Sequence, residues 1–125
     1  IKMRKILILF VITASLFSAK AQEKNAIVLL TPTDFKSQTE NKDIQLIDVR
    51  TPEEFQEIHI EKAINIDFYL EDFEVEFNKL DKDQPVYLYC RSGYRSNQSA
   101  LKLEEMGFTE IYDLEGGILN YNKEK

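Results

Sequence analysis

Short apolar runs alternate with amphipathic stretches along most of the chain. Five of these runs have the length, and the content of branched and aromatic residues, that are typical of β-strands. They lie at residues 26–30, 44–49, 63–67, 85–89 and 109–114. Because amphipathic segments separate them, the pattern predicts an α/β fold, with a five-stranded, mainly parallel sheet and helices on both of its faces.

Local signals mark where the helices between the strands begin and end. The segments TPTD and TPEE, which start at residues 31 and 51, each place a threonine cap before a proline, and in the second Glu54 completes a capping box. Amphipathic helices are predicted over residues 70–80 and 96–106, the second ending at Gly107. The Gly116–Gly117 pair predicts a turn, and a terminal helix is expected from residue 118 onward.

The first residues belong to a different class. From Met3, basic residues precede an apolar run that ends at Phe17, and the segment closes on Ala19-Lys20-Ala21, as in a secretory signal peptide. The run is shorter than the roughly 20 residues that cross a bilayer, so no stable membrane anchor is expected, although an uncleaved signal anchor is the alternative. Ile1 and Lys2 are interpreted as an artefact of the start site. We therefore expect a signal peptide over residues 1–21 and one exported domain over residues 22–125, either periplasmic or secreted.

The chain is acidic, with 22 Asp and Glu residues, 16 Lys and Arg residues and a net charge of −6. Four of the basic residues lie in the first 21 positions, so their removal leaves 12 basic and 22 acidic residues and a net charge of −10. An acidic body disfavours nucleic acid and anionic membrane surfaces as partners.

The chain contains one cysteine, Cys90, directly after the fourth predicted strand. A lone cysteine in an exported chain is buried and inert, paired with another molecule, or reactive. Its position favours reactivity, because ligands of parallel sheets bind outside the carboxyl ends of the strands. With one cysteine and one histidine, His59, a zinc site is not expected, and no metal or other cofactor is predicted.

The segment CRSGYR, from Cys90 to Arg95, predicts a tight loop before the next helix. Gly93 permits a backbone conformation that a residue with a Cβ resists. Inward-pointing amides at a helix start form a concavity that binds anions, and here they would come from Ser92, Gly93, Tyr94 and Arg95. Together with the guanidinium groups of Arg91 and Arg95, they favour a thiolate over a thiol. The loop is therefore predicted to be an anion site with a nucleophile at its base.

Four fragments, in this order, resemble the single-domain rhodaneses: DVRTPEEF, AINI, YCRSGYRS and LEGGI, which begin at residues 48, 63, 89 and 114. The resemblance covers about residues 26–121 and implies a rhodanese-like fold. It implies a sulfurtransferase in which Cys90 takes the outer sulfur of a small anionic donor such as thiosulfate. The resulting persulfide would pass this sulfur to cyanide or to a thiol, either small or on a protein. The loop amides would stabilise the sulfur anion, and Arg91 and Arg95 would hold the donor.

The resemblance also implies supporting roles for Asp48 and Ser96. Asp48 ends a neighbouring strand and is expected to orient the cysteine loop through Arg95, or alternatively to cap the next turn. Arg50 is interpreted as a structural partner of Glu54 or of another carboxylate. His59 is expected to be structural, since the residues around it depart from the family pattern.

Two other functions compete with sulfur transfer. Some phosphatases and arsenate reductases share this fold and use a cysteine and an arginine in an anion loop, but that loop is one residue longer than the spacing from Cys90 to Arg95. Rhodanese-like domains also serve as binding modules without catalysis. The retained cysteine and loop arginines favour the enzyme.

Overall fold

Five β-strands form one sheet in the computed structural model of the chain, which describes residues 25–123. The strands are β1 (Ile27–Leu30), β2 (Gln45–Asp48), β3 (Ile64–Asn65), β4 (Val86–Tyr89) and β5 (Ile111–Leu114). Their order across the sheet is β1-β5-β4-β2-β3, and every neighbouring pair is parallel. The predicted α/β fold with a five-stranded sheet is therefore confirmed, and the sheet formed by the described residues is wholly parallel.

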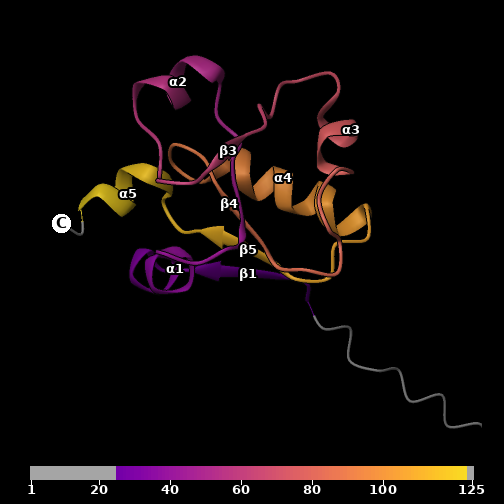
Figure 1. The fold of residues 1–125 in the computed structure, drawn as a ribbon, viewed down its shortest axis with the longest axis horizontal. Helices are drawn as coiled ribbons and strands as arrows, with labels where there is room; N and C mark the ends of the chain where they lie inside the picture. Colours follow the sequence, from indigo (N-terminus) through magenta and orange to yellow (C-terminus); the bar gives the residue numbers. More distant parts are fainter. Residues whose placement is uncertain (1–24, 124–125) are drawn as a thin grey trace, which may run out of the picture.

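The described residues form five helices (Figure 1), and all but the second contribute buried side chains to the core on the two faces of the sheet. They are α1 (Pro32–Thr39), α2 (Pro52–Glu57), α3 (Phe73–Phe77), α4 (Tyr94–Glu105) and α5 (Gly117–Lys123). Helices α1 and α5 contact each other and pack on one face, where they share an apolar cluster with β4 and β5. Helices α3 and α4 contribute to a second cluster on the opposite face.

The central strand β4 explains why the core has two halves. All four of its residues are buried. Val86 and Leu88 belong to the cluster under α3 and α4, whereas Tyr87 and Tyr89 belong to the cluster under α1 and α5. A strand that is covered on both faces has to be apolar throughout, which is why its sequence is a continuous apolar run. Cys90 continues the alternation and joins the α3 and α4 side.

Both predicted threonine caps are present. The Thr31 hydroxyl accepts a hydrogen bond from the Asp34 amide at 3.2 Å. In α2, the Thr51 hydroxyl accepts from the Glu54 amide at 3.3 Å, and the Glu54 carboxylate accepts from the Thr51 amide at 3.0 Å. The capping box predicted from TPEE is therefore confirmed, and it fixes Glu54 at the start of α2.

Two predicted elements are shorter than their sequence patterns. Residues 63–67 form a strand only at Ile64–Asn65, because β3 lies at the sheet edge and its one partner, β2, ends at Asp48. Residues 70–80 are helical only over α3. Its N-cap, Asp72, forms no side-chain cap, and turns replace the helix on both sides.

The expected signal peptide over residues 1–21 lies outside the described residues. Within residues 25–123, none of the helices has the length and apolar content that a membrane crossing requires.

Candidate active site

Cys90 lies immediately after β4, at the carboxyl end of the sheet, and α4 begins four residues later at Tyr94. Gly93 makes this short path possible. Its φ of +117° lies in the left-handed region, which glycine adopts at little cost. The helix therefore begins two residues earlier than predicted, and Tyr94 and Arg95 belong to its first turn instead of the loop.

The Cys90 sulfur is buried and hydrogen-bonded. Only 1 % of the residue is exposed. The Gly93 amide donates to Sγ at 3.1 Å, and the thiol donates to the Ser96 hydroxyl oxygen at 3.4 Å. The Ser96 hydroxyl in turn donates to the Gly93 carbonyl at 3.2 Å. Of the four predicted amides, Gly93 is the one that forms a hydrogen bond to Sγ in the described part of the chain.

The start of α5 holds the backbone of the cysteine loop. The Ile118 amide donates to the Cys90 carbonyl at 2.9 Å, and the Leu119 amide donates to the Arg91 carbonyl at 3.2 Å. Gly117 lies against the same two carbonyl groups with a φ of +64°. The GG pair after β5 thus permits both a left-handed turn and a close contact between two backbone segments.

Asp48 does not contact Arg95, so the expectation that it orients the loop through Arg95 is wrong. Its buried carboxylate accepts hydrogen bonds from the Arg50 amide at 2.9 Å and from Arg50 Nη2 at 2.7 Å. Arg50 lies two residues further along, where the backbone turns, and its side chain folds back onto Asp48. The alternative prediction, that Asp48 caps the next turn, describes the observed geometry.

Arg50 is also fixed by its other neighbours. Its guanidinium donates to the Ile58 carbonyl at 2.6 Å and lies 5.7 Å from the centroid of the Tyr89 ring. Burial lowers the pKa of Arg50, but hydrogen bonding to Asp48 and the charge of Asp48 more than offset this, so the pKa is raised. Arg50 is thus a structural partner of a carboxylate, as predicted, but the carboxylate is Asp48 and not Glu54.

Arg95 instead forms a bidentate ion pair with Glu54. Its two terminal nitrogens donate to the two carboxylate oxygens at 2.8 and 3.0 Å. Hydrogen bonding to Arg95 lowers the pKa of Glu54 to about 2. Because Glu54 also completes the capping box, the pair connects the first turn of α4 to the first turn of α2. The predicted role of Arg95 in donor binding stays a prediction.

Arg91 and Ser92 of the loop, and Tyr94 at the start of α4, are exposed. Arg91 lines a hollow of about 190 Å³, together with residues of α2, α5 and Arg50. In residues 25–123 its guanidinium forms no ion pair. The carboxyl groups of Glu54 and Glu57 line the same hollow, and Cys90 is not among its lining residues.

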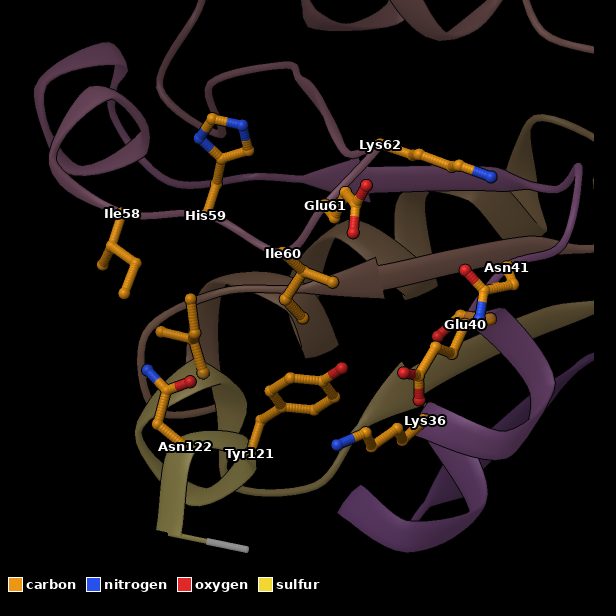
Figure 2. A pocket seen from close by; sticks show the side chains of 12 residues that line it. Lys36, Glu40, Asn41, Ile58, His59, Ile60, Glu61, Lys62, Tyr121 and Asn122 are labelled. Carbon is orange, nitrogen blue, oxygen red and sulfur yellow. The ribbon is translucent and has the colours of Figure 1, made fainter. Parts of the chain in front are cut away.

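A second cavity, of about 400 Å³, lies between α1, α5 and the segment that leads into β3 (Figure 2). The side chains of Tyr121 and Ile60 face each other across it, Lys36 approaches from α1, and Glu40 approaches from the C-cap of that helix. None of its lining residues belongs to residues 90–96, so we place the chemistry at the loop and not in this cavity.

His59 borders the second cavity, but its ring turns away from Tyr121 (Figure 2). The ring stacks on Phe55 at 3.8 Å between centroids, and Nδ1 lies 2.8 Å from the Phe55 carbonyl oxygen. These contacts agree with the structural role predicted for it. Within the described residues, no three His, Cys, Asp or Glu side chains lie together so as to hold a metal ion.

Asp113 is a candidate residue that the sequence reasoning missed. It lies within β5 opposite Leu88 of β4, is 1 % exposed, and its Oδ1 has no hydrogen-bond partner among the described residues. Burial raises its pKa to about 6, and hydrogen bonding with Ser96 opposes the rise only in part. The signal in the sequence is a carboxylate inside the apolar run IYDL.

The chain is similar to proteins of one family. The model of that family, the rhodanese-like domain, matches residues 31–124. An uncharacterized protein, YqhL of Bacillus subtilis, is 41 % identical over 91 residues, which are 73 % of this chain and 71 % of the relative. The thiosulfate sulfurtransferase GlpE of Coxiella burnetii is 37 % identical over 78 residues, which are 62 % of this chain and 70 % of the relative.

A longer relative and a solved structure extend this likeness. The tRNA uridine(34) hydroxylase of Pelagibacter ubique is 33 % identical over 85 % of this chain, but the match spans only 35 % of the hydroxylase. The crystal structure of a rhodanese-like domain protein from Staphylococcus aureus superposes with a TM-score of 0.66 at 29 % identity. That match covers 74 % of this chain and 89 % of the other.

The contact between Gly117 and the cysteine loop generates a first prediction. A Cβ at Gly117 would lie 2.6 Å from the Cys90 carbonyl oxygen and closer still to the Arg91 carbonyl group. We expect Gly117→Ala to lower the free energy of unfolding by about 3 kcal/mol or more, as measured by urea unfolding. Gly107→Ala is the control, since Gly107 also has a positive φ but has nothing within 4 Å of the added Cβ. It should cost about 1 kcal/mol. Equal costs would contradict the proposed contact.

The buried carboxyl of Asp113 generates a second prediction. The ordinary pKa of an aspartate side chain is 3.8, and burial in the folded chain raises the pKa of Asp113 to about 6. Its contribution to stability is therefore fully present below about pH 3.8 and is lost as the pH rises through about 6. As the pH rises from about 4 to about 8, the free energy of unfolding of Asp113→Asn should increase by about 3 kcal/mol relative to that of the native chain. Urea unfolding at each pH measures this difference. A difference in stability that does not change with pH would contradict the raised pKa.

Proposed function

Because this chain belongs to the rhodanese-like domain family, we propose that it is a sulfurtransferase that uses Cys90 as its nucleophile. Cys90 would carry a sulfane sulfur from a small anionic donor such as thiosulfate to a thiol or to cyanide. The observation that supports this most is the environment of Sγ, which accepts a hydrogen bond from the Gly93 amide where α4 begins. The likeness to proteins named as sulfurtransferases supports the same reaction class.

The proposed reaction has two half-reactions. In the first, the Cys90 thiolate attacks the outer sulfur of thiosulfate, the sulfur–sulfur bond of the donor breaks, and sulfite leaves with the electron pair. In the second, the thiolate of the acceptor, or cyanide, attacks the outer sulfur of the Cys90 persulfide and releases the Cys90 thiolate. In this scheme the sulfur of Cys90 is anionic when it attacks the donor and again when the acceptor releases it. An amide donor at a helix start favours such an anion.

The two arginines of the loop would then have different roles. Arg95 is held by Glu54, and its contribution is to fix α4 against α2. Arg91 is exposed beside the hollow, so its guanidinium would receive the anionic end of the donor. The predicted signal peptide leads us to propose further that the transfer takes place outside the cytoplasm.

A persulfide on Cys90 is the direct test of this function. After incubation with thiosulfate, the intact protein should gain the mass of one sulfur atom, and a small thiol should reverse the gain. Cys90→Ser should show no gain, because serine does not accept sulfane sulfur. Absence of an adduct with several donors would favour a binding module instead. Steady hydrolysis of an aryl phosphate that Cys90→Ser abolishes would favour a phosphatase.

The division of labour between the arginines can be tested by comparing two alanine variants. Arg91→Ala should raise the KM for thiosulfate by about 10-fold and leave the melting temperature unchanged, because it removes one exposed charge contact. Arg95→Ala should lower the free energy of unfolding by about 1 kcal/mol, because it leaves Glu54 without its ion pair. Glu54→Gln is the control and should resemble Arg95→Ala in stability. The assignment is wrong if Arg95→Ala raises the KM with no loss of stability.

A further inference from the structure

The cavity between α1, α5 and the segment that leads into β3 has an apolar floor and a charged rim. The floor consists of buried or half-buried side chains, namely Ile60, Ile118 and Tyr121. The rim carries four exposed charged side chains, namely Lys36, Glu40, Glu61 and Lys62. The volume of about 400 Å³ lies in the range of small-molecule sites, roughly 300–1,000 Å³. An apolar floor with a few polar groups above it is the usual composition of such sites.

Hydrogen bonds hold the floor in place. The Ile60 amide donates to the hydroxyl of the buried Tyr89 at 3.0 Å, and the Ile118 amide donates to the Cys90 carbonyl at 2.9 Å. Both partners belong to the central strand β4 or to the residue directly after it. The floor is therefore fixed to the rigid part of the sheet, and the cavity exists without a ligand to shape it.

Tyr121 gives the floor an aromatic surface. Its ring packs edge-on against Phe35, with 6.5 Å between the centroids, and faces Ile60 across the cavity (Figure 2). The Lys36 ammonium lies 6.0 Å from the centroid of the same ring. The Tyr121 hydroxyl forms no hydrogen bond with any of the described residues. The ring thus offers an apolar face and an available hydroxyl to a molecule that enters the cavity.

The charged side chains of the rim have no ion-pair partners among residues 25–123. Lys36 and Glu40 are four residues apart at the end of α1, a spacing at which opposite charges often pair, yet no ion pair joins them. Glu61 and Lys62 are likewise unpaired. The rim therefore presents two ammonium groups and two carboxylates, whose formal charges cancel. A ligand that is neutral overall but carries one charge of each sign matches this rim better than a simple anion or cation.

The charged and apolar parts of the cavity lie on different sides of it. In Figure 2, Lys36, Glu40 and Asn41 are on one side, Ile58 is on the other, and Tyr121 and Ile60 lie between them. The carboxyl end of α1, next to Glu40, also favours a positive charge. A ligand would accordingly place a charged head near Lys36 and Glu40 and an apolar body over the floor.

The turn that leads into β3 keeps a charged residue where glycine is the ordinary choice. The Ala63 amide donates to the Ile60 carbonyl at 3.0 Å, which closes a four-residue turn with Lys62 at its third position. Among the described residues, two other than glycine have a positive φ, Asn41 at 58° and Lys62 at 71°, and both line this cavity. Such conformations persist where the surrounding structure enforces them, and they concentrate at functional sites.

We propose that this cavity binds a free apolar α-amino acid, with its ammonium group at Glu40, its carboxylate at Lys36 and its side chain over Ile60, Ile118 and Tyr121. An α-amino acid carries both charges on one carbon atom. Two side chains on successive turns of one helix can reach both of these charges, since their Cβ atoms lie only about 5–6 Å apart. This inference goes beyond the proposed sulfur transfer, because it assigns a second ligand site that does not include Cys90.

A titration with L-phenylalanine, followed by the amide resonances of the full chain in ¹⁵N-labelled form, tests the proposal. We expect a dissociation constant of about 1 mM, which is in keeping with a ligand of this size. The perturbed amides should be those of the floor and rim, whereas Gln45 and Gln84, which line a different hollow, should not move. Glycine should bind about 10-fold more weakly, because it has the charged head without the apolar body.

Two derivatives of phenylalanine separate the roles of the two charges. Phenylalaninamide keeps the ammonium group and lacks the carboxylate, whereas N-acetylphenylalanine keeps the carboxylate and lacks the ammonium group. Glu40→Gln should weaken the binding of phenylalaninamide about 5-fold and leave that of N-acetylphenylalanine unchanged. Lys36→Gln should do the reverse. Glu105→Gln, which removes an exposed carboxylate on α4, is the matched control and should change neither.

Absence of saturable shifts at the floor with L-phenylalanine would overturn the proposal. Equal binding of glycine and L-phenylalanine would also overturn it, as would equal effects of Glu40→Gln on the two derivatives. Lys36 and Glu40 are exposed, so their variants should keep the melting temperature of the native chain. The titration uses no sulfur donor. Its result is therefore independent of whether Cys90 transfers sulfur.

Discussion

The path from β4 into α4 is the constraint on which the site depends. Only three residues separate Cys90 from the first residue of the helix, and this is possible because Gly93 adopts a left-handed conformation that a side chain would make costly. The same turn aims the Gly93 amide at Sγ and brings Ser96 within reach of the sulfur. Helix α5 then secures the loop from outside, through amides that bind the Cys90 and Arg91 carbonyl groups. The nucleophile is thus positioned mainly by backbone geometry.

Two ion pairs divide the charged residues around this turn. Arg50 forms an ion pair with Asp48 at the end of β2. Arg95 forms an ion pair with Glu54, which connects α4 to α2. Each pair is held by neighbours that restrict its geometry, since Arg50 also binds the Ile58 carbonyl and Glu54 also caps α2. As a result, the guanidinium left for an incoming anion is that of Arg91. Asp113, which is buried in β5, forms no ion pair among the described residues.

The sequence predicted the elements more successfully than the partners of its charged residues. Strands such as β4 and caps such as Thr51 depend on local patterns, and both were confirmed. The pairing of two carboxylates with two arginines depends on how the ends of β2, α2 and α4 meet, so Asp48 was wrongly matched to Arg95. Helix α4 begins at Tyr94 and not near Ser96, because Gly93 serves as its N-cap. The predicted loop extended to Arg95 and did not anticipate this cap. Asp113 was missed because its burial depends on the packing of α4 against β5. That packing is a tertiary contact, which the local sequence pattern around Asp113 does not reveal.

The central claim is that the sulfur at the start of α4 is the atom that carries sulfane sulfur. A crystal structure of the protein after treatment with thiosulfate tests it most directly. The account predicts electron density for one additional sulfur bonded to Cys90 Sγ, on the side of the Arg91–Gly93 backbone, with the Gly93 amide still directed at the sulfur pair. An unmodified Sγ, with the donor bound at another place or the Gly93 amide turned away, would contradict the account.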